Sequence, residues 1–338
     1  MTDRAATIDA FLAAEGWAGA RRCPLAGDAS ARRYVRLHGA GTVVLMDVPP
    51  GSGLDPRPFL HVTDWLRAGG FSAPAIIAAA PDDGLILLED LGDALFVSVA
   101  AAEPRREAGL YAAAVDVLVE LQQRPPPDAG WTPPPYDMAL LMREARLVLD
   151  WYLPAATGRD VPGDLAAEFD ALAEAAFAPV AAIRPVAVMR DYHAENLLWL
   201  PDRPGRARVG LLDYQDMLVG PPAYDLVSLL EDARRDTDGA LRAAMIARYL
   251  AATGADPEAF LHGAHVLAAQ RNLKIVGLFT RLCRRDGKPR YLAHLPRVWD
   301  HLRRDLDHPA LAPLAAWVAR HLPAPDAAVR ARIAAGPA

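Results

Sequence analysis

Three oxygen-bearing side chains, Asp191, Asn196 and Asp213, stand in order along one short stretch of this sequence. In phosphoryl transfer from a nucleoside triphosphate, one carboxylate orients the attacking hydroxyl and further oxygen groups hold magnesium. Magnesium keeps part of its water shell, so a protein supplies one or two ligands and phosphate oxygens complete the octahedron. An aspartate five residues before an asparagine has the spacing that this chemistry uses. The stretch therefore predicts Asp191 as general base and Asn196 and Asp213 as magnesium ligands.

The flanking pattern indicates which elements position these side chains. An apolar run leads into Asp191, and short strands at 197–200 and 209–212 surround a segment rich in turn formers. Asn196 and Asp213 are therefore expected at the two ends of a small hairpin. Taken singly, the three residues fit a turn residue, a cap and a solvated strand end, but the ordered triple favours a reaction site.

The same stretch resembles a known family, the aminoglycoside phosphotransferase and choline kinase superfamily. The matching features are the motif at 190–193, the amide at 196, the strand end at 213 and the segment 220–226. The resemblance implies the protein-kinase fold, ATP and Mg²⁺ as cofactors, and the roles given above to the three residues. It also implies that Asp225 braces the catalytic loop from below. A carboxylate placed in the first turn of a helix by the helix dipole is the other explanation for Asp225, and both can hold.

A closer resemblance extends over nearly the whole chain, to bacterial kinases of the anomeric hydroxyl of N-acetylmuramate and N-acetylglucosamine. It is carried by the blocks at 27–34, 46–50, 57–59, 91–92 and 281–292. This resemblance implies ATP-dependent phosphorylation of the sugar C1 hydroxyl in peptidoglycan recycling. Two alternatives remain open: a kinase for another small molecule of the aminoglycoside, choline or homoserine type, and an ATP-binding pseudokinase without chemistry.

The order of elements predicts an α+β, bilobal, protein-kinase-like fold. The first ~90 residues alternate short β-like runs with turns, interrupted by a helix at 58–67, and the pattern then turns helical. We expect a β-rich nucleotide-binding lobe at 1–90 and a mainly helical catalytic and substrate-binding lobe at 91–338. The helices are expected at 107–123, 138–152, 165–177, 223–233, 241–252 and 264–282, with more to the end.

The residues expected to bind ATP match the kinase motifs less well than the catalytic residues do. The kinase-like resemblance implies that the connector at 85–92 offers backbone groups to adenine, which nominates Glu89 and Leu91. A loop at 27–31 places Ser30 where it can cradle phosphates, but the loop has a single glycine and is weak as a motif.

The strand at 43–48 lacks the lysine that pairs with the α- and β-phosphates in kinases. If Val35 points inward to cover adenine, Arg33 shares its face, whereas Arg32, Tyr34 and Arg36 point away. Arg33 is therefore predicted to replace the lysine, with a surface role as the alternative.

Four cations fall on one face of the helix expected at 264–282 and its extension. Their spacing predicts either a solvated basic face or a site for the lactyl carboxylate of N-acetylmuramate, which nominates Lys274 and Arg281 as substrate ligands.

His193 is expected to contact a sugar hydroxyl or to brace the catalytic loop. Arg190 is expected to reach a phosphate or to pair with an internal acid.

Composition limits the class of protein. The net charge is −6 and 52% of the residues are hydrophobic, which favours a soluble globular protein and argues against binding of nucleic acid through a broad basic surface. The small-molecule amino-sugar substrate is implied by the resemblance alone. Two distant cysteines support no disulfide framework or zinc site. We expect no signal peptide, and no run reaches the ~18 apolar residues of a membrane span. A cytoplasmic protein without membrane partners is therefore expected; the oligomeric state is not specified, and a monomer is compatible.

Overall fold

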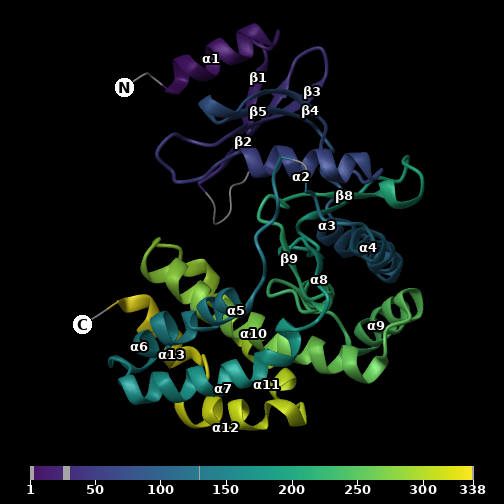
Figure 1. The fold of residues 1–338 in the computed structure, drawn as a ribbon. Coiled ribbons are helices and arrows are strands. Elements are labelled where there is room, and N and C mark those ends of the chain that lie inside the picture. The colour runs from purple at the N-terminus through teal and green to yellow at the C-terminus, as the bar shows by residue number, and fades with distance from the viewer. Residues whose placement is uncertain (1–3, 26–30, 129, 337–338) are drawn as a thin grey trace. The chain divides into compact units, whose positions relative to one another are not determined.

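The structure is a computed structural model that describes residues 4–25, 31–128 and 130–336. Two compact units interleave along the chain (Figure 1). Unit 1 comprises Met1–Val117, Pro127–Pro133 and Ala194–Met217, and unit 2 comprises Leu118–Pro126, Pro134–His193 and Leu218–Ala338. The division into a nucleotide-binding lobe at 1–90 and a catalytic lobe at 91–338 concerns function and stays a prediction.

Unit 1 contains a five-stranded antiparallel sheet with the strand order β1-β2-β3-β5-β4. Four of these strands coincide with the β-like runs of the sequence. The strand bounds are Arg21–Pro24 for β1, Arg33–His38 for β2, Thr42–Asp47 for β3, Ile76–Ala80 for β4 and Leu85–Glu89 for β5. A small antiparallel sheet beside a mostly helical remainder confirms the α+β expectation.

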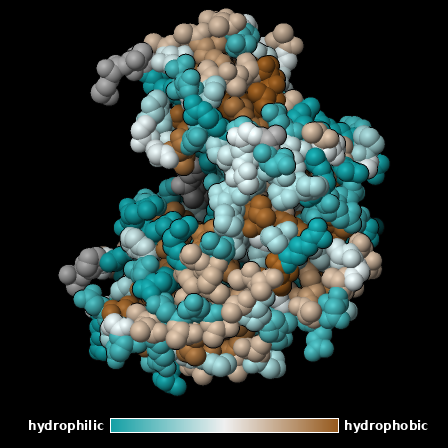
Figure 2. Space-filling model, in the orientation of Figure 1, coloured by the Kyte–Doolittle hydropathy of each residue, from teal (hydrophilic) through white to brown (hydrophobic). Residues whose placement is uncertain are grey.

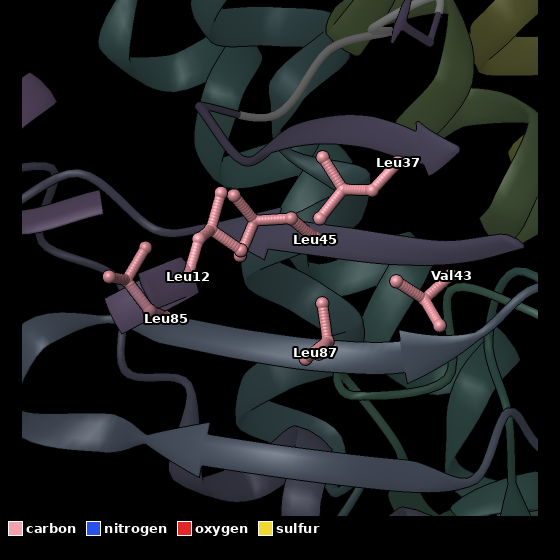
Figure 3. Packing of buried hydrophobic residues seen from close by; sticks show 6 residues of the cluster. All are labelled: Leu12, Leu37, Val43, Leu45, Leu85 and Leu87. Carbon is pink, nitrogen blue, oxygen red and sulfur yellow. The ribbon is translucent and has the colours of Figure 1, made fainter. Parts of the chain in front are cut away.

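One face of this sheet packs against helix α1 (Arg4–Ala14). Leu12 of the helix is fully buried among leucine and valine side chains from β2, β3 and β5, which Figure 3 shows on the same side of the sheet. Val35 packs against this cluster, and its register partner Leu45 belongs to it. The packing of Val35 against α1 therefore does not support the condition under which Arg33 is assigned to the phosphates. The alternation of side chains along β2 predicts correctly which residues share a face. It does not show which of the two faces α1 covers.

A second small sheet of unit 1 is the antiparallel hairpin of β7 (Leu197–Trp199) and β8 (Val209–Leu211), as expected from the sequence. The main chain anchors it at both edges: Leu211 N donates to Ser72 O at 2.9 Å, and Trp199 N donates to Ala94 O at 2.8 Å. Besides α1, the described α-helices of this unit are α2 (Arg57–Ala68), α3 (Phe96–Ala102) and the first part of α4 (Glu107–Gln122).

Unit 2 is built around the long helix α10 (Pro257–Arg284), which packs against several other helices. Gly277 allows the closest of these approaches, because a Cβ there would lie 2.1 Å from the main chain of Leu147. The other helices are α5 (Met138–Ala145), α6 (Leu153–Thr157), α7 (Gly163–Ala181), α8 (Ala223–Leu230), α9 (Gly239–Thr253), α11 (Leu295–Leu306), α12 (Ala312–His321) and α13 (Ala327–Ala335). Strands β6 (Val186–Val188) and β9 (Leu218–Gly220) form an antiparallel pair.

The continuous helix expected at 138–152 is interrupted. Helix α5 ends at Ala145, and Val148–Tyr152 form a π-helical turn before α6. Pro154, near the start of α6, has no N–H to donate to the carbonyl four residues earlier, and its ring crowds that carbonyl. The α-helical hydrogen-bond ladder therefore does not run through this segment.

The visible face of the molecule in Figure 2 is largely hydrophilic or mixed, with small hydrophobic areas. Among the described residues, the large hydrophobic side chains that are exposed are Leu54, Ile77 and Ile183. Over the same residues, no helix combines the length and the apolar character that a membrane crossing requires.

Candidate active site

The loop that leads into Asp191 belongs to unit 2 and is held by α8. The Asp225 carboxylate accepts hydrogen bonds from Met189 N at 2.6 Å and Arg190 N at 2.9 Å, and Ser228 Oγ donates to Arg190 O at 3.2 Å. Arg190 has a φ of 69°, in the left-handed region that a residue with a Cβ seldom adopts. These bonds compensate for that conformation and fix the main chain directly before Asp191.

Asp225 is completely buried. Burial raises the pKa of its carboxyl to about 7, although the two main-chain donors act in the opposite direction. Asp225 thus braces the loop through hydrogen bonds and titrates close to neutral pH.

The side chains behind this loop form a buried ionic cluster that the sequence did not predict, which we call the Glu144 cluster: Tyr136, Glu144, Arg190, Tyr224, Gln270 and Lys274. Glu144 Oε1 accepts from Arg190 Nη2 at 2.5 Å and from Lys274 Nζ at 2.9 Å. Its other oxygen accepts from the hydroxyl of Tyr136. Of the two expectations for Arg190, pairing with an internal acid is observed.

The charges in this cluster are fixed over a wide pH range. Burial alone would raise the pKa of Glu144, but Lys274 and Arg190 lower it to about 2. Burial also lowers the pKa of Lys274, but Tyr224, Glu144 and Asp191 outweigh that effect and raise it. Two cations share one carboxylate, so the cluster has a surplus positive charge within electrostatic reach of Asp191.

The basic face predicted on α10 is largely buried at its first two cations and reaches solvent at Arg285, which follows the helix. Arg271 is 6% exposed and donates to Glu231 O and Ser228 Oγ, and Lys274 is held by Glu144. Arg281 lies two turns beyond Lys274, outside the Glu144 cluster, and burial lowers its pKa. His193 is 6% exposed, and burial lowers its pKa too.

The two candidate magnesium ligands belong to unit 1 and stand side by side at the end of the β7–β8 hairpin. Leu212 N donates to Asn196 O at 2.9 Å, which joins the residue before Asp213 to Asn196. Asp213 has a φ of 57°, and with Arg190 it is one of the two non-glycine residues with positive φ in the described part of the chain. Gln215 Nε2 donates to Asp213 Oδ1 at 2.7 Å and orients that carboxylate.

This donor set fits magnesium. An amide and a carboxylate on adjacent strand ends are hard oxygen ligands, and they are few enough to leave room for phosphate and water. No group of three or more histidine, cysteine or acidic side chains with the geometry of a metal site occurs in the described ranges. The described residues therefore hold no zinc-type cage. Asn196 and Asp213 fit a magnesium site whose remaining ligands are phosphate oxygens and water.

The residues that the sequence nominates as nucleotide ligands differ in their surroundings. Ser30 lies outside the described residues. The Glu89 carboxylate accepts from Ala75 N at 3.0 Å and from Arg203 Nη2 at 2.5 Å, so this side chain has a structural function in unit 1. Leu91 is partly exposed, in the segment after β5. Arg33 shares the face of Val35 that packs on α1 and is exposed.

Sequence reasoning missed Glu144, which pairs with both Arg190 and Lys274. A weak signal was available: Glu144 follows Leu141 by three residues on α5, so a charged residue falls on the buried side of that helix. Its partners are far away in the sequence, and nothing local identifies them.

Comparisons with known sequences show which proteins this chain is similar to. A sequence model described as the phosphotransferase enzyme family matches residues 21–262. An N-acetylmuramate/N-acetylglucosamine kinase of Caulobacter vibrioides is 40% identical over 95% of this chain and 98% of its own length. A kinase of the same name from Pseudomonas aeruginosa is 35% identical over 86% of each chain.

Solved structures show the fold. A choline/ethanolamine kinase family protein from Mesorhizobium loti superposes with a TM-score of 0.62 at 16% identity, covering 94% of this chain and 99% of that one. The ADP-bound aminoglycoside phosphotransferase APH(2'')-Ib gives a TM-score of 0.60 at 13% identity, covering 88% and 97%. The family match covers most of the chain, and the relatives match it nearly end to end. This chain belongs to the phosphotransferase enzyme family.

Proposed function

We propose that this enzyme transfers the γ-phosphoryl group of ATP to the anomeric C1 hydroxyl of N-acetylmuramate and N-acetylglucosamine, in peptidoglycan recycling. The observation that carries the proposal is the 40% identity to a kinase of that name over 95% of this chain. The residues proposed for the reaction stand on a loop of unit 2 and on a hairpin of unit 1, and hydrogen bonds within each unit support both.

Asp191 is the proposed general base. The Asp225 carboxylate accepts from the main chain before Asp191 and Ser228 donates to it, so the backbone that carries the base is positioned before a hydroxyl binds. The C1 hydroxyl is more acidic than an ordinary alcohol because of the ring oxygen, so Asp191 mainly orients it and accepts its proton late in the transfer. The proton is then held on the Asp191 carboxyl.

Asn196 and Asp213 are the proposed magnesium ligands. Bound there, Mg²⁺ neutralises charge on the β- and γ-phosphates. On the nucleotide side, Ser30 remains a proposed phosphate ligand. Glu89 and Leu91 remain proposed adenine contacts through their backbone groups, because the Glu89 side chain is already engaged.

The sugar is proposed to lie against the Glu144 cluster. Lys274 and Arg190 supply one positive charge more than Glu144 balances, which suits the lactyl carboxylate of N-acetylmuramate. Arg281 and His193 are proposed as further sugar contacts, with His193 also bracing the loop. A polycationic aminoglycoside is disfavoured by the same surplus charge. Use of ATP places the enzyme, in this proposal, in the cytoplasm.

The test is phosphorus NMR of the product together with ADP release. The enzyme is incubated with MgATP and, separately, with N-acetylmuramate, N-acetylglucosamine, choline and an aminoglycoside. A sugar 1-phosphate from the first two, and no turnover of the others, supports the proposal. Phosphorylation of choline or the aminoglycoside alone overturns it in favour of another small-molecule kinase. Nucleotide binding without ADP release from any acceptor indicates a pseudokinase.

A further inference from the structure

On the described sheet and helix α2 of the first unit, neither member is found of the ion pair with which kinases hold the α- and β-phosphates. The chain has two lysines, Lys274 and Lys288, so none stands on the sheet. Helix α2 offers no buried acid to pair with one, because Asp64 is its one acidic residue and is exposed. The hydroxyl of Thr63 on this helix instead bonds the hydroxyl of Tyr214 at 2.7 Å. An arginine of this unit must therefore supply any phosphate-binding cation of the sheet.

The structure shows which face of the sheet lies toward Asp213. Burial raises the pKa of Tyr34 to about 12, and the charge of Asp213 is the next largest cause. Arg32 and Asp216 are the other charged groups that act on this phenol. Tyr34 pairs in register with Met46, which is fully buried on β3. The face of Tyr34 and Met46 is thus the one toward the candidate magnesium ligand, opposite to the face of Val35 and Arg33.

Two arginines belong to the side of Tyr34 by the period of two, and their side chains pair with different acidic residues. Arg36 makes hydrogen bonds with Asp90 and with both carboxylate oxygens of Asp93, so its guanidinium is fixed at the connector after β5. Arg32 is 9% exposed, and its Nη1 forms an ion pair with Asp216 Oδ2 at 3.9 Å, on the side of the candidate magnesium ligand. Asp216 is itself close to Asp213, because Gln215 Nε2 bonds both carboxylates.

We propose that Arg32, and not Arg33, is the cation that binds the nucleotide phosphates in place of the missing strand lysine. A guanidinium binds phosphate oxygens through its planar fork and needs no glutamate partner to stay protonated. An arginine at this position therefore explains why the strand lysine and a buried acidic partner on α2 are both missing. The ion pair with Asp216 holds Arg32 on this side until phosphates replace the carboxylate. The inference rests on the proposed use of ATP.

The experiment compares neighbouring arginines on opposite faces. Binding of ADP without magnesium, of MgADP and of adenosine is titrated by calorimetry for wild type, Arg32→Ala and Arg33→Ala. Arg32→Ala should weaken both forms of ADP by about 10–100-fold, because one charge-assisted contact is worth about 1.5–3 kcal/mol. Adenosine affinity should change by less than about 2-fold, and Arg33→Ala should match wild type. Arg32→Lys should recover part of the loss.

A structural role for Arg32 gives a different result. Asp216→Asn removes the ion pair but keeps the cation, so magnesium-free ADP should bind it at least as tightly as wild type. Equal ADP binding by wild type and Arg32→Ala, or a loss in Asp216→Asn as large as in Arg32→Ala, overturns the inference. If Arg32→Ala does not fold, Arg32→Gln replaces it in the same titrations. A wild-type enzyme that binds no ADP or ATP contradicts the proposed function instead.

Discussion

The two units hold their candidate catalytic residues in different ways. In unit 1, Asn196 and Asp213 stand on a short hairpin that main-chain hydrogen bonds from Leu211 and Trp199 attach to neighbouring segments. In unit 2, the loop before Asp191 is supported by buried charged side chains, Asp225 and the Glu144 cluster. A hairpin held by its main chain tolerates side-chain changes around it, whereas a loop held by buried charges depends on each of them. Substitutions in the two units should therefore differ in their effects on stability and activity.

The largest effect is expected at the base itself. Asp191→Asn keeps the shape of the side chain but cannot accept a proton, so turnover should fall by at least ~100-fold with MgATP affinity nearly unchanged. Asp213→Asn should instead weaken MgATP binding, because it removes a charged magnesium ligand. Steady-state kinetics and nucleotide titration measure both. Asp202→Asn, an exposed residue of the hairpin, is the matched control. Normal turnover of Asp191→Asn would show that another group is the base.

The Glu144 cluster should dominate the stability of unit 2. Glu144→Ala leaves Arg190 and Lys274 buried without their shared carboxylate, which should cost about 3–5 kcal/mol in the free energy of unfolding. Chemical denaturation measures it, with Glu144→Gln as a variant that keeps the size of the side chain. The control is Glu103→Ala, which breaks an exposed pair with Arg106 and should cost less than about 1 kcal/mol. Equal losses in the two alanine variants would contradict the contrast.

Asp225 should make the support of the Asp191 loop depend on pH. Its pKa is about 7 in the folded protein against 3.8 for the ordinary carboxyl, so between these values the folded state binds more protons than the unfolded state. This contribution to stability is present at low pH and is lost as the pH rises toward and through 7.

The measurement is the stability difference between wild type and Asp225→Asn, which cannot titrate there. Between pH 5 and pH 8 the wild type should lose roughly 2–3 kcal/mol relative to the variant. Denaturant unfolding at several pH values gives the difference directly. A difference that stays constant, or that moves in favour of the wild type as the pH rises, would show that the buried carboxyl is already ionised at pH 5.

The same contrast explains what the sequence could predict. The hairpin is local: strand-forming runs, a turn-rich segment and two polar ends lie within about twenty residues, so the pattern of 197–200 and 209–212 was sufficient. The support of Arg190 comes from Glu144, 46 residues earlier in the chain, and no periodicity identifies that pair. The assignment of Arg33 likewise depended on a contact that is distant in the sequence. Period two separates the faces of β2, but the packing of α1 against Val35 and Leu37 decides which face is covered.

The smallest effect is expected in the hairpin unit, at Gln215. Its Nε2 donates to Asp213 at 2.7 Å and to Asp216 at 3.0 Å, so Gln215→Ala removes a donor shared by two carboxylates. Because the main-chain bonds of the hairpin remain, stability should fall by only about 1–2 kcal/mol, while the magnesium concentration for half-maximal activity should rise several-fold. Magnesium titration of activity measures this, with the exposed Gln123→Ala as control. A stability loss equal to that of Glu144→Ala would mean that buried side chains, and not the main chain, hold this half as well.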